Sequence, residues 1–387
     1  MVFSSPIFLF FFLPVVYLGY RTLPRGARNG WLAAASLIFY AFGQLPYTLL
    51  LLASVAANYL FGRLLMRGSP RRKLFVGCAA AANLAVLGAF KYLDFFAASL
   101  NRALGLSLPL PGVVLPIGIS FYTFQGLSYV IDVYRNPGEG TKSPGKLLLY
   151  ISFFPQLIAG PIIKYHDVSA QIDRREITPE RTLTGLSRFI AGFAKKMLLA
   201  NPAGEVADKV FALAAGALDF RIAWLGAVCY TLQIYFDFSG YSDMAIGLGK
   251  LFGFDFAENF NLPYVSRSIR EFWRRWHISL SSWFRDYLYI PLGGNRRGKA
   301  RTSLHKFIVF FSTGLWHGAN WTFVLWGLWH GLFALLEDAN LIPQRLRRSR
   351  LGQVYTLLVV TLGFVLFRAD TLAGGWQMIS QMFTGFA

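Results

Sequence analysis

The histidine at position 317 has the side chain of this sequence best suited to acid–base chemistry. It follows an almost wholly apolar run, residues 307–316, and begins the sequence His317-Gly318-Ala319-Asn320-Trp321. Imidazole titrates near neutral pH, so it can take a proton from a hydroxyl group and return it. Three roles stay open from the local sequence: a general base, a metal ligand, or a buried histidine bonded to a carbonyl group.

Gly318 and Asn320 predict the end of a helix beside this ring. Free backbone amides and carbonyls at a helix end could contact a substrate, and Asn320 is therefore a candidate substrate-binding residue. An ionisable group in such an apolar setting is costly to bury. Within a membrane segment it is a functional-site hypothesis.

A second histidine, His277, lies in the amphipathic stretch 266–291, which we predict to be one helix. Arg270, Arg274, His277 and Ser281 fall on one narrow stripe of that helix, beside an apolar and aromatic stripe. The pattern is typical of an interfacial helix that anchors at lipid headgroups. It also suits a cavity for an anionic or phosphorylated group, which makes Arg270 and Arg274 candidate substrate-binding residues.

The other residues that could do chemistry are few. Asp237 is a carboxylate in the apolar stretch 222–254, and we expect it to pair with an arginine, orient an imidazole or cap a helix. The five histidines and two cysteines contain no His-Glu-x-x-His motif and no pair at metal-ligand spacing, which argues against a metal site. No Gly-x-Ser-x-Gly motif supports a serine nucleophile.

The composition predicts that a membrane domain positions these residues. Of 387 residues, 55% are hydrophobic and only 15% are charged, whereas soluble domains carry about 25% charged residues. The mean hydropathy is +0.45, and apolar runs of about 20 residues recur along the chain. We predict an all-α polytopic membrane protein with about ten membrane segments. Glycine and proline interrupt the pattern at 43–46, 106–116 and 147–163, where we expect broken or re-entrant helices.

The net charge of +19 comes mostly from short basic clusters between apolar runs, at residues 21–28, 63–73 and 345–350. Such clusters are typical of cytoplasmic loops that face anionic lipid, and they argue against a nucleic-acid partner. The first apolar segment precedes its positive charges, the reverse of a cleavable signal peptide, so we expect a first membrane helix there. No disulfide is expected, because Cys78 and Cys229 both lie in apolar runs.

Four sequence segments resemble the membrane-bound O-acyltransferases. Two surround the histidines: Trp276-His277-Ile278-Ser279-Leu280, followed by 285–294, and Leu315-Trp316-His317-Gly318. The other two, residues 153–162 and 235–245, are similar to the family's bacterial branch. That branch includes membrane proteins that acetylate alginate, cellulose or peptidoglycan, or that alanylate teichoic acid. The likeness extends from the N-terminal helix to about Phe367.

The resemblance implies a single membrane domain over residues 1–387, built around a central tunnel in the bacterial inner membrane and in contact with membrane lipid. The last one or two helices of longer relatives are expected to be missing or different. No bound cofactor is implied. The acyl donor would be a cytosolic thioester, commonly acetyl-CoA. The acceptor would be an extracytoplasmic polysaccharide, often reached through a separate periplasmic acetyltransferase partner.

The resemblance also implies roles for individual residues. His317 would be the catalytic histidine and would deprotonate the acceptor hydroxyl, which attacks the thioester carbonyl. His277 would orient or polarise the donor, with Arg270 and Arg274 near its phosphates, and Asp237 would structure the tunnel. The second Leu-Trp-His-Gly sequence, which contains His330, receives no role.

Two other functions stay open. A transporter or flippase would use Arg270 and Asp237 to line a path for an anionic solute, although the sequence has no clear inverted repeat of the transporter kind. An acyl relay would instead carry the acyl group across the membrane and hand it to a partner enzyme. The sequence does not identify the polysaccharide.

Overall fold

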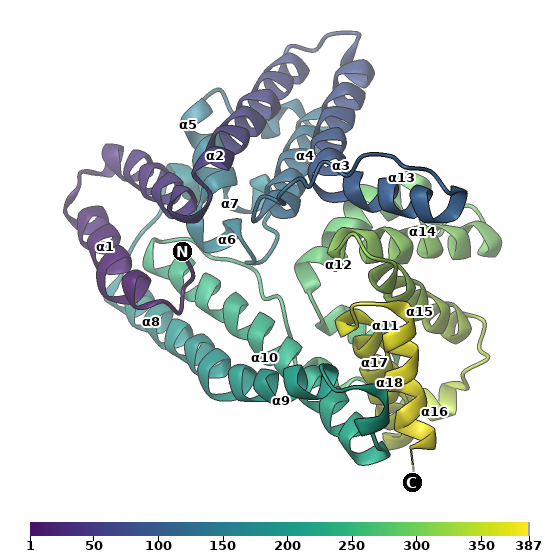
Figure 1. Ribbon diagram of the computed structural model, residues 1–387. Coiled ribbons are helices and arrows are strands. Elements are labelled where there is room, and N and C mark those ends of the chain that lie inside the picture. The colour runs from purple at the N-terminus through teal and green to yellow at the C-terminus, as the bar shows by residue number, and fades with distance from the viewer. Residues whose placement is uncertain (386–387) are drawn as a thin grey trace. The chain divides into compact units, whose positions relative to one another are not determined.

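Helices make up the regular secondary structure of residues 1–385, the part of the chain that this computed structural model describes, and no strand occurs among them (Figure 1). The chain divides into two compact units. Unit 1 contains residues 1–193 and 241–257, and unit 2 contains residues 194–240 and 258–387. The predicted all-α class is confirmed.

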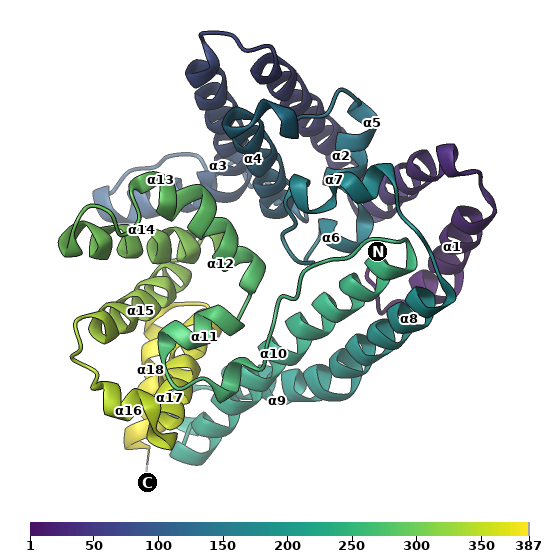
Figure 2. The ribbon, with the colours of Figure 1, turned by 180° about the vertical axis from the view of Figure 1, so that it is seen from behind.

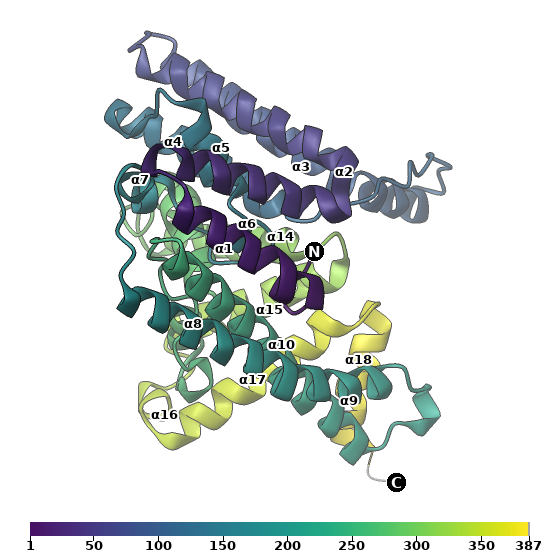
Figure 3. The same ribbon diagram turned by 90° about the vertical axis from the view of Figure 1, so that its left-hand side faces the viewer.

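Unit 1 is built on three long helices that pack against one another, α2, α3 and α4. Figure 3 shows α2 and α3 side by side along much of their length. The helices of this unit are η1 (Phe8–Phe12), α1 (Leu13–Thr22), α2 (Arg25–Met66), α3 (Arg72–Leu104), α4 (Ile119–Arg135), η2 (Pro137–Glu139), α5 (Pro144–Ser152), α6 (Phe154–Leu157), α7 (Tyr165–Asp173), nearly all of α8 (Pro179–Ala194), and the end of α10 (Phe220–Leu251).

The interruptions predicted in this half of the chain are present as broken helices. Within α2 the backbone leaves helical geometry at Gln44, where φ is −147° and ψ is 42°, two residues before Pro46. The segment 105–118 contains no helix. Phe153, with φ −56° and ψ 114°, separates α5 from α6. In each case glycine or proline removes a backbone hydrogen bond or allows a conformation that a helix excludes.

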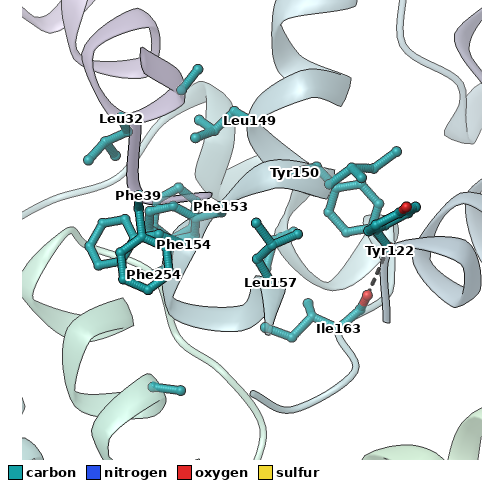
Figure 4. Packing of buried hydrophobic residues seen from close by; sticks show 14 of the residues in the cluster. Leu32, Phe39, Tyr122, Leu149, Tyr150, Phe153, Phe154, Leu157, Ile163 and Phe254 are labelled. Carbon is teal, nitrogen blue, oxygen red and sulfur yellow. Dashed lines mark hydrogen bonds between the residues drawn. The ribbon is translucent and has the colours of Figure 1, made fainter. Parts of the chain in front are cut away.

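Aromatic side chains fill the core of unit 1 (Figure 4). Phe39 and Phe154 have ring centroids 5.5 Å apart, and Phe153 and Phe254 have centroids 4.9 Å apart. The hydroxyl of the buried Tyr150 donates to the carbonyl oxygen of Ile163 at 2.8 Å. The loop after α10 thus packs on Phe153 and Phe154 through the aromatic rings of Phe252 and Phe254.

Unit 2 contains the candidate site residues. Its helices are η3 (Lys195–Ala200), α9 (Asn201–Phe211), η4 (Ala215–Ala217), the first part of α10, η5 (Pro263–Val265), α11 (Ile269–Arg275), α12 (Ile278–Phe284), η6 (Arg285–Tyr289), α13 (Ile290–Leu292), α14 (Lys299–His317), α15 (Trp321–Asp338), α16 (Gln344–Arg348), α17 (Arg350–Arg368) and α18 (Leu372–Thr384).

The prediction of one helix over 266–291 is wrong, because the chain turns sharply between α11 and α12 (Figure 2). Trp276 is extended, with φ −103° and ψ 128°, and His277 is left-handed, with φ 44° and ψ 56°. A left-handed conformation is uncommon for any residue except glycine. The helical periodicity therefore does not run through the turn, and the stripe that would join Arg270 to Ser281 does not exist.

Helices α14 and α15 approach each other closely at three glycines. A Cβ atom at Gly314 would lie 2.5 Å from the carbonyl oxygen of Phe323, and one at Gly327 would lie 2.4 Å from that of Phe310. A Cβ atom at Gly318 would lie 2.2 Å from the ring of Phe323. At Gly314 and Gly327 the obstructing atoms are backbone, so the helix pair requires glycine there. A side chain at Gly318 would instead require the ring of Phe323 to move.

Three described helices are long and apolar enough to cross a bilayer: α2, α3 and α17. The predicted count of about ten membrane segments stays a prediction. The two cysteines are free thiols, as expected.

Candidate active site

His277 lies in the turn between α11 and α12 and is buried, with 1% of its surface exposed. Its Nδ1 atom is 3.2 Å from Oδ1 of Asn259. Its ring makes an edge-to-face contact with the ring of Phe238, on α10, at a centroid distance of 4.6 Å and an interplanar angle of 86°. Its Nε2 atom is also buried and has no hydrogen-bond partner among the described residues.

Asn259 holds the turn in place. Its Oδ1 atom accepts hydrogen bonds from the backbone N–H of Ser279 at 3.1 Å and from the Ser279 hydroxyl at 2.8 Å. Its backbone carbonyl accepts from the N–H of Ile278 at 2.9 Å. These bonds satisfy amides at the start of α12 that no intrahelical carbonyl can reach. They compensate for the left-handed backbone at His277.

His317 is the last residue of α14 and is half-buried. Its ring makes edge-to-face contacts with Trp326, at a centroid distance of 4.8 Å, and with Phe367, at 5.2 Å. The predicted helix end beside the ring is confirmed, because Gly318 is extended and α15 begins at Trp321. The C-terminal end of a helix carries partial negative charge, which favours a cation there.

The indole of Trp316 lies against both histidines. Its centroid is 5.9 Å from that of His277 and 4.9 Å from that of His317, and both contacts are edge-to-face. Trp316 is itself buried. The structure therefore brings together the two histidines that the sequence singled out, on an aromatic wall contributed by α10, α14, α15 and α17.

Arg270 and Arg274 are exposed on α11, whereas His277 is buried, so the three do not share a face. Arg270 makes an ion pair with Asp338 at 3.1 Å, and Lys306 binds the same carboxylate. Arg274 makes no hydrogen bond or ion pair with a described residue. Of the two predicted phosphate ligands, Arg274 is the one whose charge is uncompensated.

Asp237 forms an ion pair with Lys196, at the start of η3, and so its partner is a lysine instead of the expected arginine. Half of the aspartate side chain is exposed. The next residue, Phe238, is the one that contacts His277. Asp237 thus connects the helix turn beside His277 to the neighbouring η3 segment.

Both polar atoms of the Asn320 side chain make structural bonds. Oδ1 accepts from the backbone N–H of Thr322 at 3.1 Å, which caps the start of α15. Nδ2 donates to the carbonyl oxygen of Asp370 at 2.9 Å. Asparagine is a preferred N-cap residue for this reason, so the geometry gives Asn320 a capping role.

His330, in the second Leu-Trp-His-Gly sequence, is fully buried. Its ring stacks on Phe272 at 6.1 Å and meets Trp326 edge-to-face at 5.3 Å. Neither ring nitrogen has a hydrogen-bond partner in the described part of the chain. Trp326 separates it from His317, so the histidines of the two Leu-Trp-His-Gly sequences occupy different positions around one indole.

Comparison with known proteins identifies the family. The family model of the membrane-bound O-acyltransferases matches residues 140–356, a range that includes both histidines. The chain belongs to this family. Membrane-bound O-acyltransferases use an acyl donor, and the chain is accordingly an O-acyltransferase.

Two of three named relatives match nearly the whole chain, and the third matches about two thirds of it. It is 46% identical to a probable alginate O-acetylase of Azotobacter vinelandii, over 99% of this chain and 78% of that protein. It is 36% identical to a peptidoglycan O-acetyltransferase of Helicobacter pylori, over 99% of this chain and 80% of that protein. A teichoic acid D-alanyltransferase of Bacillus subtilis is 28% identical over 65% of this chain and 68% of its own length.

Two residues in the range matched by the O-acyltransferase model position the site and escaped the sequence analysis. Asn259 is one, and the buried Glu337 is the other. The Glu337 carboxylate accepts from the backbone N–H groups of Ile269, at 2.6 Å, and Arg270, at 3.2 Å, and so caps α11. A usable signal existed for Glu337: it is an acidic residue at the end of the apolar run 321–336. Asn259 gives no such signal.

Proposed function

We propose that this O-acyltransferase moves an acetyl group from a cytosolic thioester, with acetyl-CoA as the donor, to hydroxyl groups of an extracytoplasmic polysaccharide. The observation that carries the proposal is the placement of His277 and His317 on one indole, in a chain whose relatives include an alginate O-acetylase and a peptidoglycan O-acetyltransferase. The protein would act in the bacterial inner membrane as a multi-pass protein, with shorter and broken helices completing its membrane domain.

His317 would act as the general base. A ring nitrogen takes the proton of the acceptor hydroxyl while the hydroxyl oxygen forms a bond to the thioester carbonyl carbon. The C–S bond then breaks, the sulfur leaves with the electron pair, and the imidazolium returns its proton to the thiolate. The C-terminal end of α14 stabilises the positive charge that the ring holds between these steps. A positioned base of this kind contributes about 10²–10⁴-fold to the rate.

His277 would bind the donor through its Nε2 atom. That atom is buried and has no protein partner among the described residues, while Nδ1 faces Asn259. The Asn259 oxygen also accepts from the Ser279 N–H, so it is an acceptor, and Nδ1 of His277 must carry the proton. Nε2 is then left as an acceptor that would bind an N–H or O–H group of the donor. Arg274, whose charge is uncompensated, would bind a phosphate of the donor, as guanidinium groups commonly do.

Two alternatives compete with complete transfer to the polymer. In an acyl relay, this protein would pass the acetyl group to a separate periplasmic acetyltransferase. In a transporter, polar residues such as Asp237 would line a path for an anionic solute. The ion pair of Asp237 with Lys196 counts against this role, because it leaves the carboxylate neutralised.

The test uses the purified protein in lipid vesicles with acetyl-CoA labelled in its acetyl group and a soluble oligosaccharide acceptor. Label on the sugar without any added protein supports complete transfer. Label on the sugar only after a periplasmic acetyltransferase is added supports the relay. Uptake of an anionic solute into sealed vesicles without any thioester, and no label on sugar under either condition, would overturn the proposal.

A further inference from the structure

A cavity of about 370 Å³ in unit 1, remote in sequence from the two histidines, is lined mostly by arginine. Its size is within the usual range for small-ligand sites, about 300–1,000 Å³. The end of α1, the start of α2 and the segment between α7 and α8 form it. The lining residues are Arg21, Arg25, Arg28, Arg175, Glu176, Ile177 and Thr178.

The protein neutralises only part of the positive charge of this arginine cavity. Its four arginines face one glutamate, and no described carboxylate lies within 4 Å of any of their guanidinium nitrogens. Arg21 and Arg25 are exposed and make no hydrogen bond with a described residue. Like charges held this close repel one another, so an arrangement of this kind is stabilised by a bound anion.

Arg175 is held rigidly in the cavity wall. Its Nε atom donates to the hydroxyl of Tyr20 at 2.8 Å and to the carbonyl oxygen of Phe252 at 3.0 Å, and Nη1 donates to the carbonyl oxygens of Gln171 and Ile172. The remaining nitrogen, Nη2, is buried and has no hydrogen-bond partner among the described residues. A buried donor without an acceptor is unfavourable, and an oxygen of a ligand in the cavity would satisfy it.

The N-terminal end of α2 adds to the positive electrostatic potential of the cavity. No side chain caps this 42-residue helix, because its N-cap residue is Pro24, and no acidic residue lies in its first turn. Instead the first turn carries Arg25 and Arg28. Helix N-termini attract anions through their free N–H groups and the helix dipole, so the two arginines and the helix end favour the same kind of ligand.

We propose that the arginine cavity is a binding site for a phosphate ester group. Guanidinium groups bind phosphate oxygens in pairs of parallel hydrogen bonds. Because α2 is a candidate membrane span and the cavity lies at its end, an anionic phospholipid headgroup has direct access. A soluble phosphate compound would have the same chemistry, and the experiment separates these two sources. The proposal is independent of the acyl transfer in unit 2.

The test measures phosphatidylglycerol binding to the purified full-length protein in neutral detergent by native mass spectrometry. Arg21→Gln/Arg25→Gln removes two charges from the cavity without touching the bonds of Arg175. Arg296→Gln/Arg301→Gln removes two exposed arginines that lie outside the three basic clusters and keeps the net charge matched. We expect the first variant to weaken binding at least tenfold and the matched control to weaken it less than twofold.

Equal weakening by the two variants would overturn the proposal, because the net charge of the protein would then account for binding. Undiminished binding by the cavity variant would also overturn it. Inorganic phosphate is the second probe. Displacement of the lipid by millimolar phosphate at constant ionic strength supports a soluble occupant of the cavity, whereas resistance to phosphate supports the headgroup.

Discussion

The rings of His277 and His317 both meet the indole of Trp316 edge-to-face, with centroid distances of 5.9 and 4.9 Å. One histidine lies in a turn between two short helices and the other at the end of a long one. A single buried side chain therefore couples the positions of the two groups proposed to act on donor and acceptor. We therefore expect substitutions of the residues that hold these two histidines in place to reduce acyl transfer.

Replacement of Trp316 by leucine tests this coupling. Without the indole both rings lose an aromatic contact and can shift, and a misplacement of about 1 Å can reduce turnover about 10²-fold. We expect the maximal rate of acetyl transfer to fall by this order while the protein still folds. The control is Trp224→Leu, which removes an indole that packs on Phe383. An equal loss of activity in both variants, with equal loss of stability, would contradict the coupling.

Removal of the Asn259 side chain should reduce stability and acetyl transfer more than removal of the hydroxyl of its partner Ser279. Asn259→Ala removes the acceptor of two hydrogen bonds and the neighbour of His277 Nδ1, and leaves the buried N–H of Ser279 unsatisfied. We expect a loss of about 1–3 kcal/mol in the free energy of unfolding and a strong loss of acetyl transfer. Ser279→Ala retains the amide bond to Asn259 and should have a smaller effect on both. The reverse order, measured by denaturant unfolding and activity, would refute this account.

Glu337 should affect acetyl transfer although it lies at the opposite end of α11 from His277. Glu337→Gln replaces one carboxylate oxygen by an NH₂ group, so one of the two backbone N–H groups at the start of α11 loses its acceptor. We expect destabilisation of about 1–3 kcal/mol and reduced activity. Tyr355→Phe removes only the 3.3 Å bond from the tyrosine hydroxyl to the same carboxylate, and should cost less. Thermal unfolding of the two variants provides the comparison.

Gly327→Ala tests the close approach of α14 and α15. Its Cβ atom would lie 2.4 Å from the Phe310 carbonyl oxygen, and overpacking of this kind costs about 1–3 kcal/mol. Gly88→Ala in α3 is the matched control, because a Cβ atom there meets nothing within 4 Å. Alanine is the better helix former by about 0.5–1 kcal/mol, so the control should be neutral or stabilising. A Gly327→Ala protein as stable as the wild type would show that the two helices can move apart without loss of stability, which would contradict this prediction.

The sequence is sufficient to predict those features of the fold that depend on nearby residues. The break in α2 follows from Pro46, and the end of α14 follows from Gly318 and Asn320, because each acts within one helical turn. The apolar composition predicts the helical class for the same reason: an apolar segment in a bilayer must satisfy its own backbone hydrogen bonds.

The features that the sequence cannot predict depend on distant partners. The turn at His277 requires hydrogen bonds to Asn259, which accepts them and lies eighteen residues earlier in the chain. The ion pairs of Asp237 with Lys196 and of Arg270 with Asp338 are likewise products of the tertiary fold. Periodicity describes one helix at a time, and so it placed His277 on the exposed stripe of the arginines when it is in fact buried.

The role of His317 as the catalytic base is tested by acetylation of the polysaccharide by a His317→Ala variant, quantified beside the wild type and a His166→Ala control. His166 is partly exposed in unit 1 and pairs with Asp132. We expect the His317→Ala protein to retain expression and membrane insertion but to lose acetylation by at least about 10²-fold, and the His166→Ala protein to retain acetylation. Normal acetylation by the His317→Ala protein at wild-type abundance would contradict the account.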